Sequence, residues 1–235
     1  MSSAPMGMVL SMHVAIIMNG NSRWAAQRGL PPTAALDEGV ATLRNTVRLA
    51  ADAGVRTLTL YSICTPDCTR PRQEIAADLG VLGSYLRSDA EQCRERSIRI
   101  NVIGNNGQLG AALPRDFNGP TPSSCSDSRM QLRIVVDYSA HDSVVRATWR
   151  STDACAPETF DRQLREIDWT ALPAGAVDLL VRTGGGSWQS AFMLWEAAYA
   201  RLHYVDCLWP DFTPRRFQRA LACYSGADGQ LVSIA

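Results

Sequence analysis

The chain alternates between short apolar runs and longer stretches in which apolar residues recur every three or four positions. Six runs have the length and composition of strands: His13–Met18, Thr57–Ile63, Arg99–Ile103, Leu132–Asp137, Ala176–Arg182 and His203–Leu208. Four stretches have helical spacing: Val40–Ala53, Ile75–Arg96, Ser143–Arg150 and Ser190–Leu202. Alternation of strands and helices with short connections predicts an α/β fold in which helices flank both faces of a central parallel sheet.

Ligands bind such sheets beyond the carboxyl ends of the strands. Here those ends carry polar and glycine-rich turns at Asn19, residues 64–70, residues 104–105, Asp137 and residues 182–186. We therefore expect these turns to converge on one rim. A different segment, Asn118–Ser124, contains glycine and two prolines and is predicted to form a loop.

Composition narrows the class of protein. Lysine plus arginine equals aspartate plus glutamate at 23 each, so no overall charge favours nucleic acid or an anionic membrane. No apolar run approaches the roughly 20 residues of a membrane span, which argues against stable membrane insertion. Seven cysteines and three histidines show no zinc-binding spacing, which favours free thiols in a reducing cytoplasm. We expect residues 1–12 to be a disordered lead-in and residues 13–235 to form one catalytic domain.

The most informative segment runs from His13 to Trp24. A buried strand is predicted to lead into the turn Asn19-Gly20-Asn21-Ser22-Arg23 and then a helix. Backbone N–H groups at the start of a helix, together with an arginine, form an anion-binding site. The alternative is an ordinary capping turn, with Asn21 or Ser22 as the cap.

Three further segments carry candidate chemistry. Residues 61–71 contain Ser62, Cys64, Asp67 and Arg70, and Asp67 is either a general base or simply the start of a turn after Pro66. Residues 181–195 run from a strand ending in Arg182 through three glycines to Trp188 and Ser190, a second candidate anion site. Residues 197–212 contain Arg201 and end in Trp-Pro-Asp-Phe.

Together these segments resemble the signatures of the cis-prenyltransferases, the undecaprenyl diphosphate synthase family, from residue 13 to about residue 217. The resemblance implies prenyl diphosphate substrates, an apolar substrate tunnel, and a homodimer with the segment from Arg182 through Trp209 near its interface. It also implies roles for individual residues. The diphosphate-binding set is Gly20, Asn21, Ser22, Arg23, Arg70, Arg182 and Ser190; the pocket-lining set is Trp24, Ser62, Cys64 and Trp188; and Asn19 and Asp67 hold catalytic positions.

The chain departs from the family pattern at several of these positions. The family has a magnesium-binding Asp where this chain has Asn19, a metal-binding Glu where it has Arg201, and a second diphosphate-binding arginine where it has Trp188. Because Mg²⁺ prefers anionic oxygen ligands, we expect no metal ligand among these residues and a dependence on Mg²⁺ that is weakened or lost. Arg201 is instead expected to neutralise a diphosphate directly, beside Arg182 and Ser190. Trp188 offers a π face to a carbocation.

These departures favour an enzyme that ionises an allylic prenyl diphosphate and directs the cation to irregular, head-to-middle coupling or to cyclisation, as lavandulyl and cyclolavandulyl diphosphate synthases do within the family. Three alternatives stay open. They are a single-substrate terpene cyclase on the same fold, an ordinary cis-polyprenyl diphosphate synthase, and a catalytically inactive partner subunit. The arginines at 23, 70 and 182 and Ser190 argue against the last.

Overall fold

The computed structural model describes residues 12–63, 72–103, 128–136, 138–150, 156–167, 175–186 and 192–225. Its strands are β1 (His13–Ile17), β2 (Thr57–Ile63), β3 (Ile98–Ile103), β4 (Met130–Val136), β5 (Leu179–Arg182) and β6 (Arg201–Tyr204). Its α-helices are α1 (Asn21–Arg28), α2 (Pro32–Asp52), α3 (Arg72–Glu95), α5 (Ala140–Arg150), α6 (Pro157–Ile167) and α7 (Pro214–Ser225), and a 3₁₀ turn covers Trp209–Asp211.

The six strands form one sheet in the order β3-β4-β2-β1-β5-β6, and every neighbouring pair is parallel. The predicted α/β class is therefore confirmed. Strand β1 lies between β2 and β5, so the turn that follows it is flanked on both sides by the ends of other strands. This places Asn19 in the middle of the carboxyl edge of the sheet.

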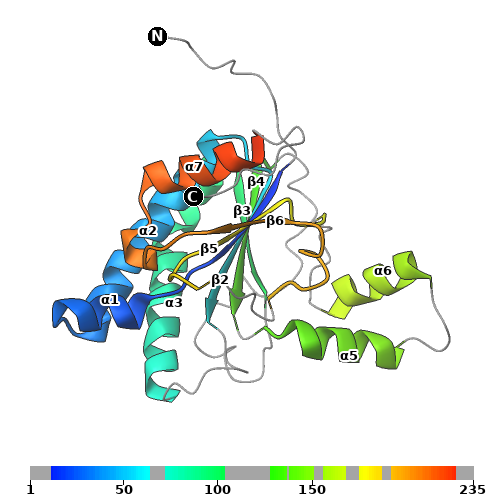
Figure 1. Cartoon of the computed structure of the whole chain (residues 1–235), viewed down its shortest axis with the longest axis horizontal. Coiled ribbons are helices and arrows are strands. Elements are labelled where there is room, and N and C mark those ends of the chain that lie inside the picture. Colours follow the sequence, from blue (N-terminus) through cyan, green and yellow to red (C-terminus); the bar gives the residue numbers. More distant parts are fainter. Residues whose placement is uncertain are drawn as a thin grey trace, which may run out of the picture.

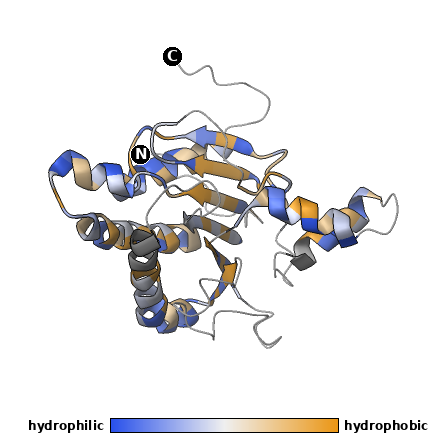
Figure 2. Ribbon diagram, turned by 90° about the horizontal axis from the view of Figure 1, so that it is seen from below, coloured by the Kyte–Doolittle hydropathy of each residue, from blue (hydrophilic) through white to orange (hydrophobic). Residues whose placement is uncertain are grey.

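Helices cover both faces of the sheet (Figure 1). Val14 and Ile16 of β1 belong to the larger apolar cluster, which contains residues of α2, α3 and α7. Ala15 and Ile17 belong to the second cluster, with Phe192 from the segment before β6. Strand β1 is buried along its whole length, as expected for a central parallel strand. Figure 2 shows the same arrangement as hydrophobic strands beside helices that carry both polar and apolar positions.

Strands β1 to β4 begin and end close to the predicted positions, but several helical predictions need correction. Helix α2 begins at Pro32 rather than Val40, because proline is well suited to the first turn of a helix. Helices α6 and α7 were not predicted, although Phe160 and Leu164 of α6 pack with α5 around Ala147.

The predicted helix over residues 190–202 is wrong for its described part. Residues 192–199 form bends and turns, and Met193 has a φ of 47°, which an α-helix does not contain. Strand β6 begins at Arg201, inside the predicted helix, and ends at Tyr204 rather than Leu208. Ala and Leu favour helices locally, whereas pairing with β5 decides the outcome for residues 201–204.

The structure tests several other predictions only in part. Met12, which we assigned to the lead-in, is buried, and its carbonyl accepts hydrogen bonds from the backbone N–H groups of Arg56 and Thr57. Residues 1–11 and the predicted loop at 118–124 lie outside the described residues. Cys93, Cys207 and Cys223 are free thiols. In the described part of the chain, no helix is long and apolar enough to cross a membrane.

Candidate active site

The turn after β1 presents the start of helix α1 at the rim of the sheet. Gly20 is the N-cap residue, with φ of 116°, and no side chain caps the helix. The alternative prediction of a cap at Asn21 or Ser22 is therefore wrong. The first intrahelical bond runs from the Trp24 N–H to the Gly20 carbonyl at 2.9 Å. The N–H groups of Asn21, Ser22 and Arg23 precede that bond, which is the arrangement that binds anions at helix starts.

Glycine is required at two positions of this rim. A Cβ atom on Gly20 would lie 2.8 Å from a methyl carbon of Leu208. A Cβ atom on Gly184, where φ is 98°, would lie 2.8 Å from Nη2 of Arg23 and 2.9 Å from Cβ of Asn19. The turn after β1 therefore packs against Leu208, and the turn after β5 packs against Arg23 and Asn19, more closely than a larger residue at either glycine allows.

Thr183, at the end of β5, forms hydrogen bonds to the turn after β1. Its Oγ1 accepts the Asn19 N–H at 2.9 Å and lies 3.0 Å from the Asn19 carbonyl oxygen. That carbonyl also accepts the N–H of Trp209 at 2.9 Å. The backbone of Asn19 is thus fixed from two other segments, so its side chain leaves the sheet at a defined point.

Two arginines meet at this rim. Arg23 donates from Nη2 to the Gly184 carbonyl at 2.7 Å. Arg182 is buried, with 4% of its surface exposed. Burial lowers the pKa of Arg182, Tyr204 opposes that shift, and the positive charge of Arg23 lowers the pKa further. Two cations that influence each other in a partly dry site favour an anion between them.

The structure brings together seven of the predicted site residues: Asn19, Gly20, Asn21, Ser22, Arg23, Trp24 and Arg182. Trp24 also has a structural contact, because its indole N–H donates to Asp211 at 2.8 Å and its ring carries the Arg28 guanidinium 4.3 Å from the ring centroid. Ser62 is half-buried in β2. The remaining predicted residues lie outside the described residues: Cys64, Asp67, Arg70, Trp188 and Ser190.

Arg201 does not lie where we predicted. The register of β5 and β6 pairs Arg201 with Leu179 and Arg182 with Tyr204. Three strand residues, or about 10 Å, therefore separate the two arginines along parallel strands. Arg201 is exposed at the opposite edge of the sheet, where it donates to the Cys223 carbonyl at 2.6 Å. Within one chain, the expectation that Arg201 lies beside Arg182 at a shared diphosphate is wrong.

The described residues do not fit a magnesium site at this rim. Asn19 presents a neutral amide and the Arg23 guanidinium lies close to it, whereas Mg²⁺ is bound by carboxylates and phosphates. Across the described ranges there is no group of three or more His, Cys, Asp or Glu side chains placed to hold a metal ion. The donor set here suits an anion rather than a cation.

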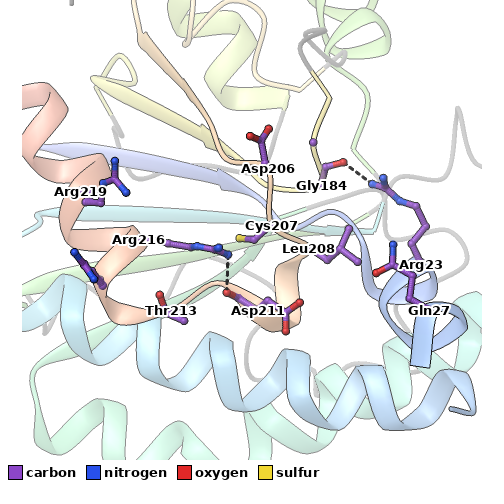
Figure 3. Close-up of a pocket in the computed structure, with 12 residues that line it drawn as sticks. Arg23, Gln27, Gly184, Asp206, Cys207, Leu208, Asp211, Thr213, Arg216 and Arg219 are labelled. Atoms are coloured by element: carbon purple, nitrogen blue, oxygen red, sulfur yellow. Dashed lines mark hydrogen bonds between the residues drawn. The ribbon is translucent and has the colours of Figure 1, made fainter. Parts of the chain in front are cut away.

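A cavity of about 850 Å³ opens beside this rim, between α1 and α7 (Figure 3). Arg23 and the turn at Gly184 form one wall, and Arg215, Arg216 and Arg219 of α7 line the other side. The sequence reasoning did not single out these three arginines. Their spacing was a visible signal, because Arg219 lies four residues after Arg215 and three after Arg216, which places the three side chains on one side of α7.

Comparison with known proteins places this geometry in a family. Residues 17–231 match the Prenyltransf family model, which describes undecaprenyl diphosphate synthases. The chain is 35% identical to isoprenyl transferase 1 of Bradyrhizobium diazoefficiens, over 92% of this chain and 87% of that protein. It is 33% identical to the isoprenyl transferase of Aquifex aeolicus, over 94% of this chain and 95% of that protein. The chain belongs to the undecaprenyl diphosphate synthase family.

A solved structure confirms the cis-prenyltransferase fold. Lavandulyl diphosphate synthase from Lavandula x intermedia, solved in complex with dimethylallyl diphosphate, superposes with a TM-score of 0.78 at 23% identity, over 90% of this chain and 94% of that one. Family membership makes this protein a prenyltransferase that acts on prenyl diphosphates. The turns after β1 and β5 are therefore candidate binding positions for the diphosphate.

Proposed function

We propose that this prenyltransferase ionises an allylic prenyl diphosphate with arginine side chains and backbone N–H groups, and directs the carbocation to irregular, head-to-middle coupling or to cyclisation. One observation carries the proposal. Arg23 of α1 donates to the carbonyl of Gly184, which follows Arg182 at the end of β5 by two residues, and the side chain beside this contact is the neutral Asn19. The site thus offers positive charge where an ordinary metal site needs carboxylates.

The chemical step is cleavage of the bond between the allylic carbon and the diphosphate oxygen. The electron pair leaves with the diphosphate, so negative charge grows there while the carbon becomes cationic. Donors already fixed in place stabilise such growing charge without reorganising. The Arg23 and Arg182 guanidinium groups, with the N–H groups of Asn21 and Ser22, would be these donors. Each charge-assisted hydrogen bond contributes about 1.5–3 kcal/mol.

The fate of the cation is assigned to residues outside the described ranges. Trp188 would face the cation with its π surface, and Asp67 would accept the proton that the product loses. Arg70 and Ser190 would complete the diphosphate contacts. The acceptor is either the double bond of a second allylic diphosphate, which gives coupling, or a double bond of the same chain, which gives a ring. We further propose a homodimer, because closed two-fold pairs are the commonest oligomers.

A second candidate is ordinary chain elongation with isopentenyl diphosphate. The names of the relatives favour it, since the proteins at 33–35% identity are isoprenyl transferases. The neutral Asn19 and the rim arginines favour the first proposal. The two differ in whether the product contains an isopentenyl unit.

Product analysis separates the two candidates. The protein is incubated with dimethylallyl, geranyl or farnesyl diphosphate, with and without isopentenyl diphosphate, in magnesium or in chelator. Mass spectrometry of dephosphorylated products should show coupled or cyclic products without isopentenyl diphosphate. Products that grow by five carbons only when isopentenyl diphosphate is added would establish chain elongation instead. The predicted homodimer is checked by light scattering at micromolar concentration, where a monomer mass would reject it.

A further inference from the structure

The described lining of the cavity between α1 and α7 contains more basic than acidic side chains. The chain as a whole is neutral, with 23 basic and 23 acidic residues. Four arginines, at positions 23, 215, 216 and 219, line this one cavity, against two aspartates, at positions 206 and 211. Figure 3 shows Arg23 on one side of the cavity and the arginines of α7 on the other, with the 206–211 segment between them.

One of the two aspartates is already neutralised from outside the cavity. Asp211 forms an ion pair with Arg28 at 3.1 Å, and it accepts the indole N–H of Trp24 at 2.8 Å. Arg28 does not line the cavity. Only Asp206 is therefore left to offset the four arginines of the lining.

The arginines of α7 are not held by carboxylates of the described residues. Arg216 donates to the backbone carbonyl of Asp211 at 3.1 Å, which leaves its charge in place. Within the described ranges, no carboxylate forms an ion pair with Arg215 or Arg219. The charge of Arg219 reaches a neighbouring group: after burial, it is the second cause that lowers the pKa of His203. Clustered cations without acidic partners are typical of phosphate recognition.

The side chain of Arg23 connects the cavity to the candidate active site. Arg23 lines the cavity and donates at 2.7 Å to the carbonyl of Gly184, in the turn that follows Arg182. Helix α7 adds the positive end of its dipole, since it begins at Pro214 beside the cavity. Among the described residues, apolar lining is confined to Cys207 and Leu208, so these walls offer little surface to a prenyl chain.

We propose that the α1–α7 cavity is a second diphosphate-binding site, separate from the turn after β1 and linked to it by Arg23. Its ligand is a free diphosphate anion, such as the one released when a prenyl diphosphate ionises. The proposal goes beyond the proposed course of the carbocation and holds equally for chain elongation, because both reactions release diphosphate.

Calorimetric titration of the whole protein with inorganic diphosphate, in chelator, tests the site. The wild type should bind one more diphosphate per chain than the double variant Arg215→Ala, Arg219→Ala does under the same conditions. The double variant removes two charge-assisted contacts, so one class of sites should lose at least tenfold in affinity while the others are unchanged. The matched control is Arg48→Ala, Arg87→Ala, which removes the same charge from exposed positions on α2 and α3 and should bind as the wild type does.

Two further arms complete the experiment. The variant Arg215→Lys, Arg219→Lys keeps the charge and should retain most of the affinity lost with alanine. Titration of the wild type and the double alanine variant with farnesyl thiolodiphosphate, which does not ionise readily, identifies the source. Equal binding of this analogue by the two proteins assigns the cavity to free diphosphate, whereas weaker binding by the variant would overturn that assignment in favour of the head of a second prenyl substrate. Equal binding of inorganic diphosphate by the alanine variant and its control would overturn the proposal.

Discussion

The amino and carboxyl ends of strands β1 and β5 differ in how their polar groups are hydrogen-bonded. At the amino end, the backbone N–H of His13 donates to Asp178 at 2.7 Å, and its ring nitrogens lie 3.0 Å from the Gly175 carbonyl and 2.7 Å from the Thr59 hydroxyl. Burial, followed by the charge of Arg133, lowers the pKa of His13 to about 4. At this end the His13 side chain is therefore neutral, and both of its ring nitrogens have hydrogen-bond partners.

At the carboxyl end, the same strands lead to an uncapped helix start and two neighbouring arginines. Such an arrangement favours the binding of an anion, because like charges repel and helix N–H groups need acceptors. The amino end therefore serves the fold, and the carboxyl end serves binding. Four substitutions test this division, from the largest expected effect to the smallest.

Arg182→Ala should lower kcat/KM roughly a hundredfold or more. The change removes a buried guanidinium, and two charge-assisted contacts to a phosphate are together worth about 3–6 kcal/mol. Steady-state kinetics on an allylic diphosphate would measure it. Arg48→Ala, on the exposed face of α2, is the control. Kinetics equal to those of the control would remove Arg182 from the site. By the same reasoning, Arg23→Ala and Arg70→Ala should each lose at least tenfold.

Gly184→Ala should lower activity about tenfold and cost about 1–2 kcal/mol of stability. Its Cβ would lie 2.8 Å from Nη2 of Arg23, at a φ of 98° that alanine rarely adopts. Gly29→Ala is the matched control, because Gly29 has a positive φ of 62° but nothing lies within 4 Å of the added Cβ. Gly29→Ala should lose stability and keep its kcat/KM. Equal activity losses in the two variants would mean that backbone strain alone explains the effect.

His13 should make stability depend on pH at the amino end. The folded state keeps His13 neutral down to a pKa of about 4, whereas the unfolded chain takes up a proton near pH 6.5. Its contribution is therefore complete above pH 6.5 and is lost as the pH falls toward 4, by up to about 3 kcal/mol. Urea unfolding at pH 7 and pH 5 would measure the loss. His13→Gln should reduce the difference between the two pH values, and an unchanged difference would assign it to other groups.

Arg201→Ala should change kcat/KM by less than twofold. The side chain is exposed at the amino edge, and its hydrogen bond goes to the Cys223 carbonyl. The loss of one exposed hydrogen bond costs about 1 kcal/mol or less. Kinetics at matched protein concentration would check this. A loss as large as that of Arg182→Ala would break the division between the two edges and bring Arg201 to the diphosphate from another chain.

The carboxyl-edge turns could be predicted because their chemistry is local. A strand followed by Asn19-Gly20-Asn21-Ser22-Arg23 specifies both the helix start and the anion donors within six residues of each other. The error at Arg201 has the opposite origin. Its position depends on where β6 begins, and that start is set by pairing with β5 rather than by the local Ala-rich sequence. The strand begins at Arg201 rather than His203, which places the Arg201 side chain at the amino edge of the sheet.

The basic cavity escaped prediction for a related reason. Arg23 and Arg219 are nearly 200 positions apart, and only the packing of α7 beside the 206–211 segment places them around one space. Motifs identify residues that act near each other in sequence. Charged residues from helices that are distant in sequence can be placed together only once the order of the strands is known.

The central claim is that arginines and backbone N–H groups, rather than a metal held by carboxylates, bind the prenyl diphosphate at the carboxyl edge. Its most direct test is the Kd of farnesyl thiolodiphosphate, measured by calorimetry in excess chelator and again in millimolar Mg²⁺. The account predicts a Kd in chelator within about threefold of that in Mg²⁺, and a Kd at least tenfold weaker for Arg182→Ala in both buffers. Binding that disappears in chelator and returns only with Mg²⁺ would contradict it.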